Sequence, residues 1–349
     1  IFRWLVPRKL AKAPRRSTLC MARQRVGVMP LVRLAAQLVK LLAEPQTPGA
    51  FYQGMRLMAV DGFAVNLPDT PANQRAFGRP VNGRSPGAFP QAQALGLMEV
   101  GTHVFWRWRI SKCNTDETRV VPALLKCLQE NMLLLWDRGL AAFDLVRQVR
   151  QRGAHLLAHW KINRILPPVR VLKDGSYLSR LYRNDSDRRA GRDGIDVRVI
   201  EYTLDDPARA GCGQIHRLLT TLLDARRHPA QTLVELYHLR WEEELAIDEL
   251  KTHEMEREVL RSQTPAGVAQ EIYGLLLGHY VLRTLMHEAA KRTAISPTRI
   301  SFTATLKIVR CRLPEYSPDP RKNRKWWRSL LEEIADEQLP PRGNRIYPR

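Results

Sequence analysis

The sequence predicts an α/β protein in which helices flank a mixed β-sheet, and three observations support this fold class. Short apolar runs that end at polar or turn residues, such as residues 132–136, are typical of buried strands. Segments with apolar residues at helical spacing lie between these runs, and a longer one covers residues 268–292. At 349 residues, of which 44% are hydrophobic, the chain is long enough to bury a large core.

The first two strands are expected at residues 55–60 and 63–68. Asp61 and Gly62 stand between these runs, and because Asp-Gly favours a tight turn, the pattern predicts a hairpin. Further strands are expected at residues 92–100, 103–110, 132–136 and 155–160, and helices at residues 116–130 and 141–151. The run at 132–136 ends at Asp137, which places a carboxylate at the C-terminal end of a buried strand.

Composition and element order divide the chain into four regions. Residues 1–50 form a basic helical N-terminal region, which we expect to be truncated because the chain starts at Ile1 rather than at a methionine. The other regions are an α/β core at 51–162 and 224–295, a β-rich insertion at 163–223, and a helical basic C-terminal region at 296–349. Within the insertion, strands are expected at residues 177–182, 196–203 and 215–222.

The net charge indicates the class of partner. The chain carries 56 Lys and Arg against 35 Asp and Glu, a formal charge of +21 at pH 7. Such an excess favours a polyanionic partner. Because the basic residues run along the whole chain rather than along one amphipathic helix, nucleic acid is favoured over a membrane surface. No apolar stretch approaches the ~18 residues of a transmembrane helix, so no membrane association is expected.

The cysteines indicate the compartment. The five cysteines form no CxxC pair and no metal-ligand spacing. A scattered, odd-numbered set in a chain of this size is typical of a reduced, cytosolic protein rather than a disulfide framework.

Residues 237–251 carry the most informative pattern in the chain. Tyr237, Arg240, Glu244 and Lys251 are separated by three, four and seven residues, which places all four on one face of a single helix. A separate apolar stripe on the same helix would face the core. From spacing alone, a solvated charged face with ordinary ion pairs explains the pattern equally well.

The residue types favour a more specific interpretation. Tyr-x2-Arg-x3-Glu-x6-Lys, with Trp241 directly after the arginine, resembles the signature of bacterial insertion-sequence transposases of the DDE type, in the insertion sequence four family. The resemblance implies that Glu244 is the third metal-binding carboxylate. It also implies that Tyr237, Arg240 and Lys251, together with Trp241, contact the DNA near the cleaved end.

Two upstream blocks extend the resemblance, which covers residues 20–349. Asp61 and the loop that follows resemble the family's first catalytic block, although the same Asp-Gly pair also fits a plain hairpin. The apolar run ending in Asp137-Arg138-Gly139 resembles the second block. It implies that Asp137 is a metal ligand and that Arg138 contacts DNA, whereas a surface aspartate paired with Arg138 is the alternative.

The order of elements, with two strand aspartates and a glutamate on a late helix, is that of a ribonuclease-H-like fold. In this fold Asp61, Asp137 and Glu244 would meet at one end of the sheet and hold two divalent ions ~3.5–4 Å apart. Carboxylate oxygens suit Mg²⁺ or Mn²⁺, and no His/Cys cluster competes for zinc.

The resemblance implies a DNA transposase that performs metal-dependent excision (cut-and-paste) and strand transfer of an insertion sequence. Its partners would be the terminal inverted repeats of the element and the target DNA, bound by a homodimer on paired ends. Such a protein would act in the bacterial cytoplasm, associated with the nucleoid. The alternatives are an inactive or truncated remnant that only binds DNA, and a ribonuclease-H-like structure-specific nuclease.

Two aromatic segments remain open to either interpretation. Residues 321–328 mix basic residues with two tryptophans and suit either a DNA-backbone contact or a solvated basic linker. Aromatic residues of the insertion, such as Tyr202 and the preceding Trp160, could stack on a displaced base or serve as core and cross-strand partners.

Overall fold

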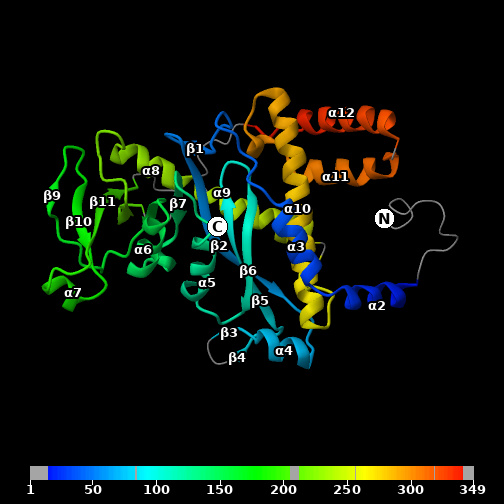
Figure 1. The fold of residues 1–349 in the computed structure, drawn as a ribbon, viewed down its shortest axis with the longest axis horizontal. Helices are drawn as coiled ribbons and strands as arrows, with labels where there is room; N and C mark the ends of the chain where they lie inside the picture. The colour runs from blue at the N-terminus through cyan, green and yellow to red at the C-terminus, as the bar shows by residue number, and fades with distance from the viewer. Residues whose placement is uncertain (1–14, 83–84, 205–211, 256, 318, 341–349) are drawn as a thin grey trace.

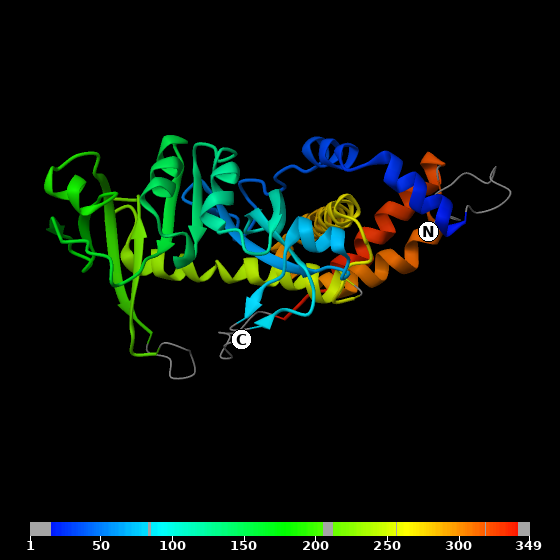
Figure 2. The ribbon, with the colours of Figure 1, turned by 90° about the horizontal axis from the view of Figure 1, so that it is seen from below.

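A mixed β-sheet runs through the centre of the molecule and carries helices on both faces (Figures 1 and 2). The computed structural model describes residues 15–82, 85–204, 212–255, 257–317 and 319–340. Helices α5 (Glu117–Leu125) and α6 (Phe143–Gln151) cover one face. Helices α8 (Ala230–His238) and α9 (Trp241–Asp248) run along the other (Figure 2).

Five strands form the core of the sheet, in the order β6-β5-β2-β7-β8. They are β2 (Met55–Asn66), β5 (Gln91–Glu99), β6 (Val104–Lys112), β7 (Met132–Trp136) and β8 (His155–His159). The pairs β2–β7 and β7–β8 are parallel, whereas β5 is antiparallel to both of its neighbours. This spatial order, third-second-first-fourth-fifth along the chain with only the second strand reversed, is that of the predicted ribonuclease-H-like fold.

The hairpin predicted at Asp61-Gly62 is wrong. Strand β2 continues without a turn through both residues, and β5 pairs with it from Met58 to Asn66. The apolar alternation also continues past the glycine, with Phe63 and Val65 buried, so the long antiparallel ladder outweighs the local turn preference. A Cβ at Gly62 would lie 3.0 Å from Glu117 Oε1 and 3.2 Å from Leu95 Cδ1, so the position is crowded as well as extended.

The predicted strand at residues 132–136 is confirmed as β7, and its environment explains its composition. All of its residues are buried, because parallel neighbours lie on both sides and helices cover both faces. The helix predicted at 116–130 begins where expected, since Asp116 caps α5 by accepting a hydrogen bond from the backbone N–H of Thr118 at 2.9 Å. It ends already at Leu125, three residues after Pro122.

The insertion extends the same sheet. Its strands are β9 (Arg170–Val171), β10 (Tyr177–Leu181), β11 (Ile195–Thr203) and β12 (Ile215–Thr220), with the short helix α7 (Asp185–Arg189) between β10 and β11. The three strands expected there are confirmed. Because β12 pairs antiparallel with β8, the insertion continues the core sheet from its β8 edge.

Smaller elements precede and surround the core. They are α2 (Arg16–Val26), α3 (Met29–Leu38), β1 (Phe51–Tyr52), α4 (Pro71–Phe77), β3 (Val81–Asn82), β4 (Ser85–Pro86) and the 3-10 turn η1 (Arg138–Leu140). The N-terminal helices rest on the core through hydrogen bonds. Arg23 of α2 donates to Gln270 Oε1 at 2.9 Å and to the Gly267 carbonyl at 2.8 Å.

The long helix α10 (Pro265–Thr293) joins the sheet to the C-terminal helices (Figure 1). Its first part, as far as Tyr280, belongs to the main hydrophobic core. Its second part, from Leu282 to Ala290, forms another core with α11 (Phe302–Arg312) and α12 (Pro320–Asp336). The turns η3 (Pro297–Arg299) and η4 (Leu313–Glu315) connect these helices.

The basic linker considered for residues 321–328 is wrong, because the segment lies within α12. Asp319 caps the helix by accepting a hydrogen bond from the Arg321 N–H at 2.8 Å, and Pro320 occupies the first turn. Of the helices in the described ranges, none is long and apolar enough to span a bilayer.

Candidate active site

The two predicted aspartates lie on neighbouring parallel strands. Asp61 is in β2, and Asp137 directly follows β7. The register sets Ala59 opposite Leu135, and two residues further along each strand bring Asp61 beside Asp137. Glu244 comes from α9, which packs against β2. The topology therefore gathers all three carboxylates at one end of the core sheet.

The electrostatics of Asp61 reflect this arrangement. Burial raises the pKa of Asp61, and the nearby carboxylates of Asp137 and Glu244 add to this effect. The Gly62 N–H, which donates to Asp61 Oδ1 at 2.7 Å, and the charge of Arg240 work against it. Asp61 therefore interacts electrostatically with both other carboxylates and with Arg240.

The single helix predicted for residues 237–251 is wrong in detail. Helix α8 ends at His238, and α9 begins at Trp241. Between them the backbone forms hydrogen bonds between residues three apart. The Arg240 N–H, for example, donates to the Tyr237 carbonyl at 3.0 Å, which makes this turn tighter than an α-helix. After Asp248 the chain enters a π-helical turn, η2 (Glu249–Glu254). The three segments follow one another in line along the sheet (Figure 2).

The structure brings together three of the four signature residues. Arg240 Nη2 lies 3.1 Å from Glu244 Oε1, and Tyr237 is an electrostatic neighbour of Arg240. Lys251 is exposed on η2, and no contact described for it connects it to the other three. Trp241 is 41% exposed at the start of α9. The side chain of Arg138 lies outside the described part of the chain.

Arg240 is the cation at the centre of the site. Its side chain is only 13% exposed. Burial opposes its charge, but Tyr237, Asp137, Glu243 and Glu244 outweigh burial and raise its pKa. Arg240 therefore stays charged in an otherwise acidic environment.

Tyr237 supports the end of β7. Its hydroxyl donates to the carbonyl of Trp136 at 3.4 Å, and Trp136 directly precedes Asp137. The phenol is 7% exposed, and burial raises its pKa, so it remains a neutral donor. On its other side its ring stacks on His159, with ring centroids 6.4 Å apart.

Aromatic and imidazole rings continue from Tyr237 into the insertion. The ring centroids of His159 and His216 are 6.0 Å apart. His216 in turn stacks on Tyr202, with ring centroids 5.4 Å apart. Trp160 is 2% exposed and packs in the main core. The core interpretation of Trp160 is thus confirmed. Tyr202 is half-buried where the insertion meets residues 237–251, hereafter the signature segment.

Two further carboxylates at the site escaped the sequence analysis. Glu117 is half-buried on α5, accepts a hydrogen bond from Gln93 Nε2 at 2.8 Å, and has its pKa raised by burial and by Asp61. Glu243 is completely buried, and burial and then Asp61 raise its pKa well above the usual range. Spacing could have revealed Glu243, since it lies on the apolar stripe of α9.

The donor set suits a hard divalent cation in charge and chemistry. Carboxylates surround the site, and both oxygens of Glu243 are buried without a hydrogen-bond partner among the residues that the structure describes. In the described ranges, however, no three His, Cys, Asp or Glu side chains stand close enough together to hold a metal ion as they are. Arg240 engages Oε1 of Glu244, so a cation bound through that oxygen would take the place of the guanidinium.

A buried ionic cluster fixes η2, which continues from α9. Glu249 lies 3.2 Å from His103 Nδ1 and 3.0 Å from His279 Nε2, and it accepts a hydrogen bond from Arg283 Nε at 2.9 Å. His103 Nε2 also lies 2.8 Å from Glu242 on α9. Burial opposes the charge of Glu249, but Arg283 and His103 hold its pKa well below the usual range. The cluster thus ties the signature segment to the β5–β6 connection and to α10.

Glu254, at the end of η2, gives a pH-dependent prediction. Burial raises its pKa from 4.5 to about 8, and its Oε2 is buried with no partner in the described part of the chain. Because the folded state holds the proton more tightly than the unfolded state, this group stabilises the fold below pH 4.5, and that contribution is lost as the pH rises through 8. The amide of Glu254→Gln does not titrate. We therefore expect the free energy of unfolding of the variant, relative to that of wild type, to rise by a few kcal/mol between pH 4.5 and pH 8 (about 1.4 kcal/mol per pKa unit). Urea unfolding at a series of pH values measures the difference, and parallel curves would contradict the expectation.

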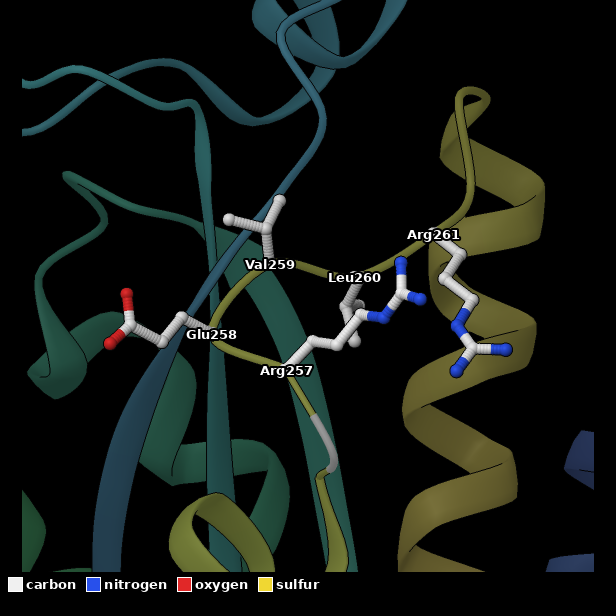
Figure 3. A pocket seen from close by; sticks show the side chains of 5 residues that line it. All are labelled: Arg257, Glu258, Val259, Leu260 and Arg261. Carbon is white, nitrogen blue, oxygen red and sulfur yellow. The ribbon is translucent and has the colours of Figure 1, made fainter.

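A pocket lies away from the carboxylates. Residues 257–261, in the loop between η2 and α10, line an open space of about 710 Å³ (Figure 3). The side chains of Arg257 and Arg261 point toward α10, and Glu258 points away from both (Figure 3). The loop is joined to the end of β2 by the hydrogen bond from Leu260 N–H to the Asn66 carbonyl at 2.9 Å. Five residues of strand, about 16 Å, separate Asn66 from Asp61.

Comparison with known proteins identifies the family. A family model described as the transposase DDE domain matches residues 52–281. The transposase InsG for insertion sequence element IS4, from Escherichia coli (strain K12), is 28% identical over 340 residues, which cover 95% of this chain and 75% of InsG. The putative transposase InsZ from the same strain is 27% identical over 150 residues, which cover 42% of this chain and 50% of InsZ.

Among solved structures, the cryo-EM structure of the piggyBac transposase synaptic complex with hairpin DNA covers 84% of this chain and 57% of that chain, at 11% identity and a TM-score of 0.46. The match to the family model spans most of the chain, from β1 into α10, and it confirms the resemblance inferred from the signature residues. The chain therefore belongs to the family of transposases with a DDE domain, enzymes that cleave DNA, transfer DNA strands and generally depend on divalent metal ions.

Proposed function

We propose that Asp61, Asp137 and Glu244 are the catalytic carboxylates and that they hold Mg²⁺ or Mn²⁺, as two ions. The observation that carries this assignment is the electrostatic coupling of Asp61 to both other carboxylates from two adjacent parallel strands and α9. The mutual repulsion of such a cluster is relieved by a bound cation. When bound, the ions supply activation of the attacking water or 3′-hydroxyl and stabilisation of the leaving oxygen.

The chain's own residues would orient the DNA. Arg240 can make a forked contact with a phosphate, and its present partner Glu244 would be released to bind a cation. Lys251 and Trp241 are exposed on the same segment and suit a phosphate and a base or sugar respectively. Tyr237 would hold the end of β7, and with it Asp137, through its bond to the Trp136 carbonyl. Arg138 completes the proposed DNA-binding set by its place beside Asp137.

The substrates and assembly follow from the same assignment. The chain would excise an insertion sequence by cutting at its terminal inverted repeats and would join it to target DNA, acting as a homodimer on paired ends. The net charge of the chain, +21, supports its binding to a polyanion such as DNA. We also propose that the four regions, at 1–50, 51–162 with 224–295, 163–223 and 296–349, act as separate functional parts.

Metal-dependent DNA cleavage tests the proposal. The substrate is DNA that carries the inverted repeats flanking the gene, incubated with Mg²⁺ or Mn²⁺. Cuts at the repeat ends and joined strand-transfer products are expected, and both should be absent with Asp137→Asn. Tight DNA binding without any cutting by the wild-type chain would contradict the proposed chemistry and support a DNA-binding remnant. Nicks without joined products would support a structure-specific nuclease.

The forked contact proposed for Arg240 gives a separate prediction. Arg240→Lys keeps the charge but loses the planar pair of donors, so cleavage of repeat-end DNA should fall by about tenfold or more. Gel-shift and cleavage rates on the same DNA measure the effect. Arg147→Lys, at an exposed arginine on α6, is the matched control. Equal activity of the two variants would remove Arg240 from the DNA-binding set.

A further inference from the structure

Glu243 occupies a position where the fold requires an apolar side chain. It shares one face of the signature segment with Ala246 and Leu250, three and seven residues further along, and all three are buried. Its own exposure is 0%. Transfer of an unpaired carboxylate into such a site is costly. A hydrogen-bond donor or a cation is therefore needed to compensate the charge, and the described neighbouring side chains form no hydrogen bond to it.

The surroundings of Glu243 show what kind of partner is needed. Neither carboxylate oxygen has a hydrogen-bond partner among the described residues, and both atoms are buried. Because α9 packs against β2, this face of the helix is directed at the strand that carries Asp61. Asp61 is accordingly the strongest charged neighbour of Glu243, ahead of Arg240, Glu244 and Asp137.

The charge balance of the site is strongly negative. The carboxylates of Asp61, Asp137, Glu117, Glu243 and Glu244 interact with one another. Among the described residues, Arg240 is the guanidinium that acts on this cluster, and Glu244 already engages it at 3.1 Å. Glu243 thus has a negative neighbour in Asp61, and no cation in the described part of the chain makes a hydrogen bond to it.

We propose that Glu243 is a further ligand of a divalent cation at this site and shares that cation with Asp61 from the buried side of α9. The inference rests on the proposed placement of a cation at Asp61, Asp137 and Glu244. Two unpartnered carboxylate oxygens are hard donors and suit a cation of the Mg²⁺ or Mn²⁺ class. The signature segment would then contribute two consecutive glutamates, one from its core face and one from its exposed face.

Binding of Mn²⁺ alone to the full-length chain, without DNA, tests this inference. Free Mn²⁺ is measured by electron paramagnetic resonance, and the melting temperature is recorded with and without Mn²⁺. Glu243→Gln preserves the shape of the side chain, so the apparent Kd for Mn²⁺ should rise about tenfold or more. Its melting temperature without metal should equal or exceed that of wild type, because the substitution relieves repulsion from Asp61. A general structural defect would instead lower this temperature.

Matched variants separate the outcomes. Glu254→Gln changes another glutamate that has a buried oxygen, Oε2, without a partner among the described residues. Its charged neighbours are Arg310 and Glu249 rather than Asp61, so the variant should leave Mn²⁺ binding unchanged. Glu243→Leu restores the apolar stripe, and it replaces Glu243→Gln in the Mn²⁺-binding measurement if the glutamine variant does not fold. If Asp61→Asn and Glu244→Gln weaken Mn²⁺ binding while Glu243→Gln and Glu243→Leu do not, Glu243 is only a neutral carboxylic acid of the core, and the catalytic assignment stands. If wild type binds no Mn²⁺ at millimolar concentration, or none of these variants weakens its binding, both the inference and the proposed metal site are wrong.

Discussion

Glu244→Gln is expected to lower the rate of DNA cleavage by about three orders of magnitude while leaving DNA binding almost unchanged. Loss of a metal ligand removes several kcal/mol of transition-state stabilisation, and each 1.4 kcal/mol corresponds to about tenfold in rate. Binding persists because the substitution removes no positive charge, and the released Arg240 remains available to a phosphate. Cleavage of labelled repeat-end DNA and gel shifts on the same DNA measure the two quantities.

A control from the preceding helix makes this comparison specific. Glu235 is an exposed carboxylate on α8 that accepts a hydrogen bond from Gln231 Nε2 at 2.8 Å. Glu235→Gln makes the same chemical change outside the site, so both cleavage and binding should match wild type. If Glu244→Gln cuts as fast as Glu235→Gln, Glu244 is not the third carboxylate of the metal site.

The second large effect is on stability. Glu249→Ala is expected to lower the free energy of unfolding by about 3–5 kcal/mol, because it leaves the buried guanidinium of Arg283 without its carboxylate. His279, which is also buried, would lose its partner at the same time. Chemical denaturation followed by circular dichroism measures the loss.

Two further variants identify the cause of the expected loss. Glu258→Ala removes an exposed carboxylate from the loop after η2 and should change stability very little. The double variant Glu249→Leu/Arg283→Met removes both charges and should be more stable than Glu249→Ala, since no buried charge remains unpaired. A double variant as unstable as the single one would show that packing, rather than the unpaired charge, dominates.

The sequence predicted the parts of the fold that depend on strong local patterns. Strand β7 was recognisable because five consecutive apolar residues end at a polar one, and β5, β6 and the strands of the insertion followed the same logic. The turn at Asp61 was predicted wrongly because Asp-Gly is a local signal. The pairing of β2 with β5 that overrides it comes from residues about thirty positions away.

The predicted site was incomplete for a related reason. Asp61, Asp137 and Glu244 were predicted because a known pattern marks them, and Glu243 was not predicted although the same spacing argument places it on the apolar face. The cluster around Glu249 could not be predicted, since His103, His279 and Arg283 lie 146, 30 and 34 residues from it. Only the folded topology shows that these side chains share one buried site.

The position of His279 and Arg283 along α10 has a mechanical consequence. Tyr280 still belongs to the core under the sheet, and Leu282 already belongs to the core shared with α11 and α12. The residues that clamp Glu249 therefore lie on either side of the seam between the two cores. One turn of α10 therefore joins this seam to η2, which continues from the helix that carries Glu244. The C-terminal helices and the segment that carries Glu244 are thus anchored to the same turn of one helix.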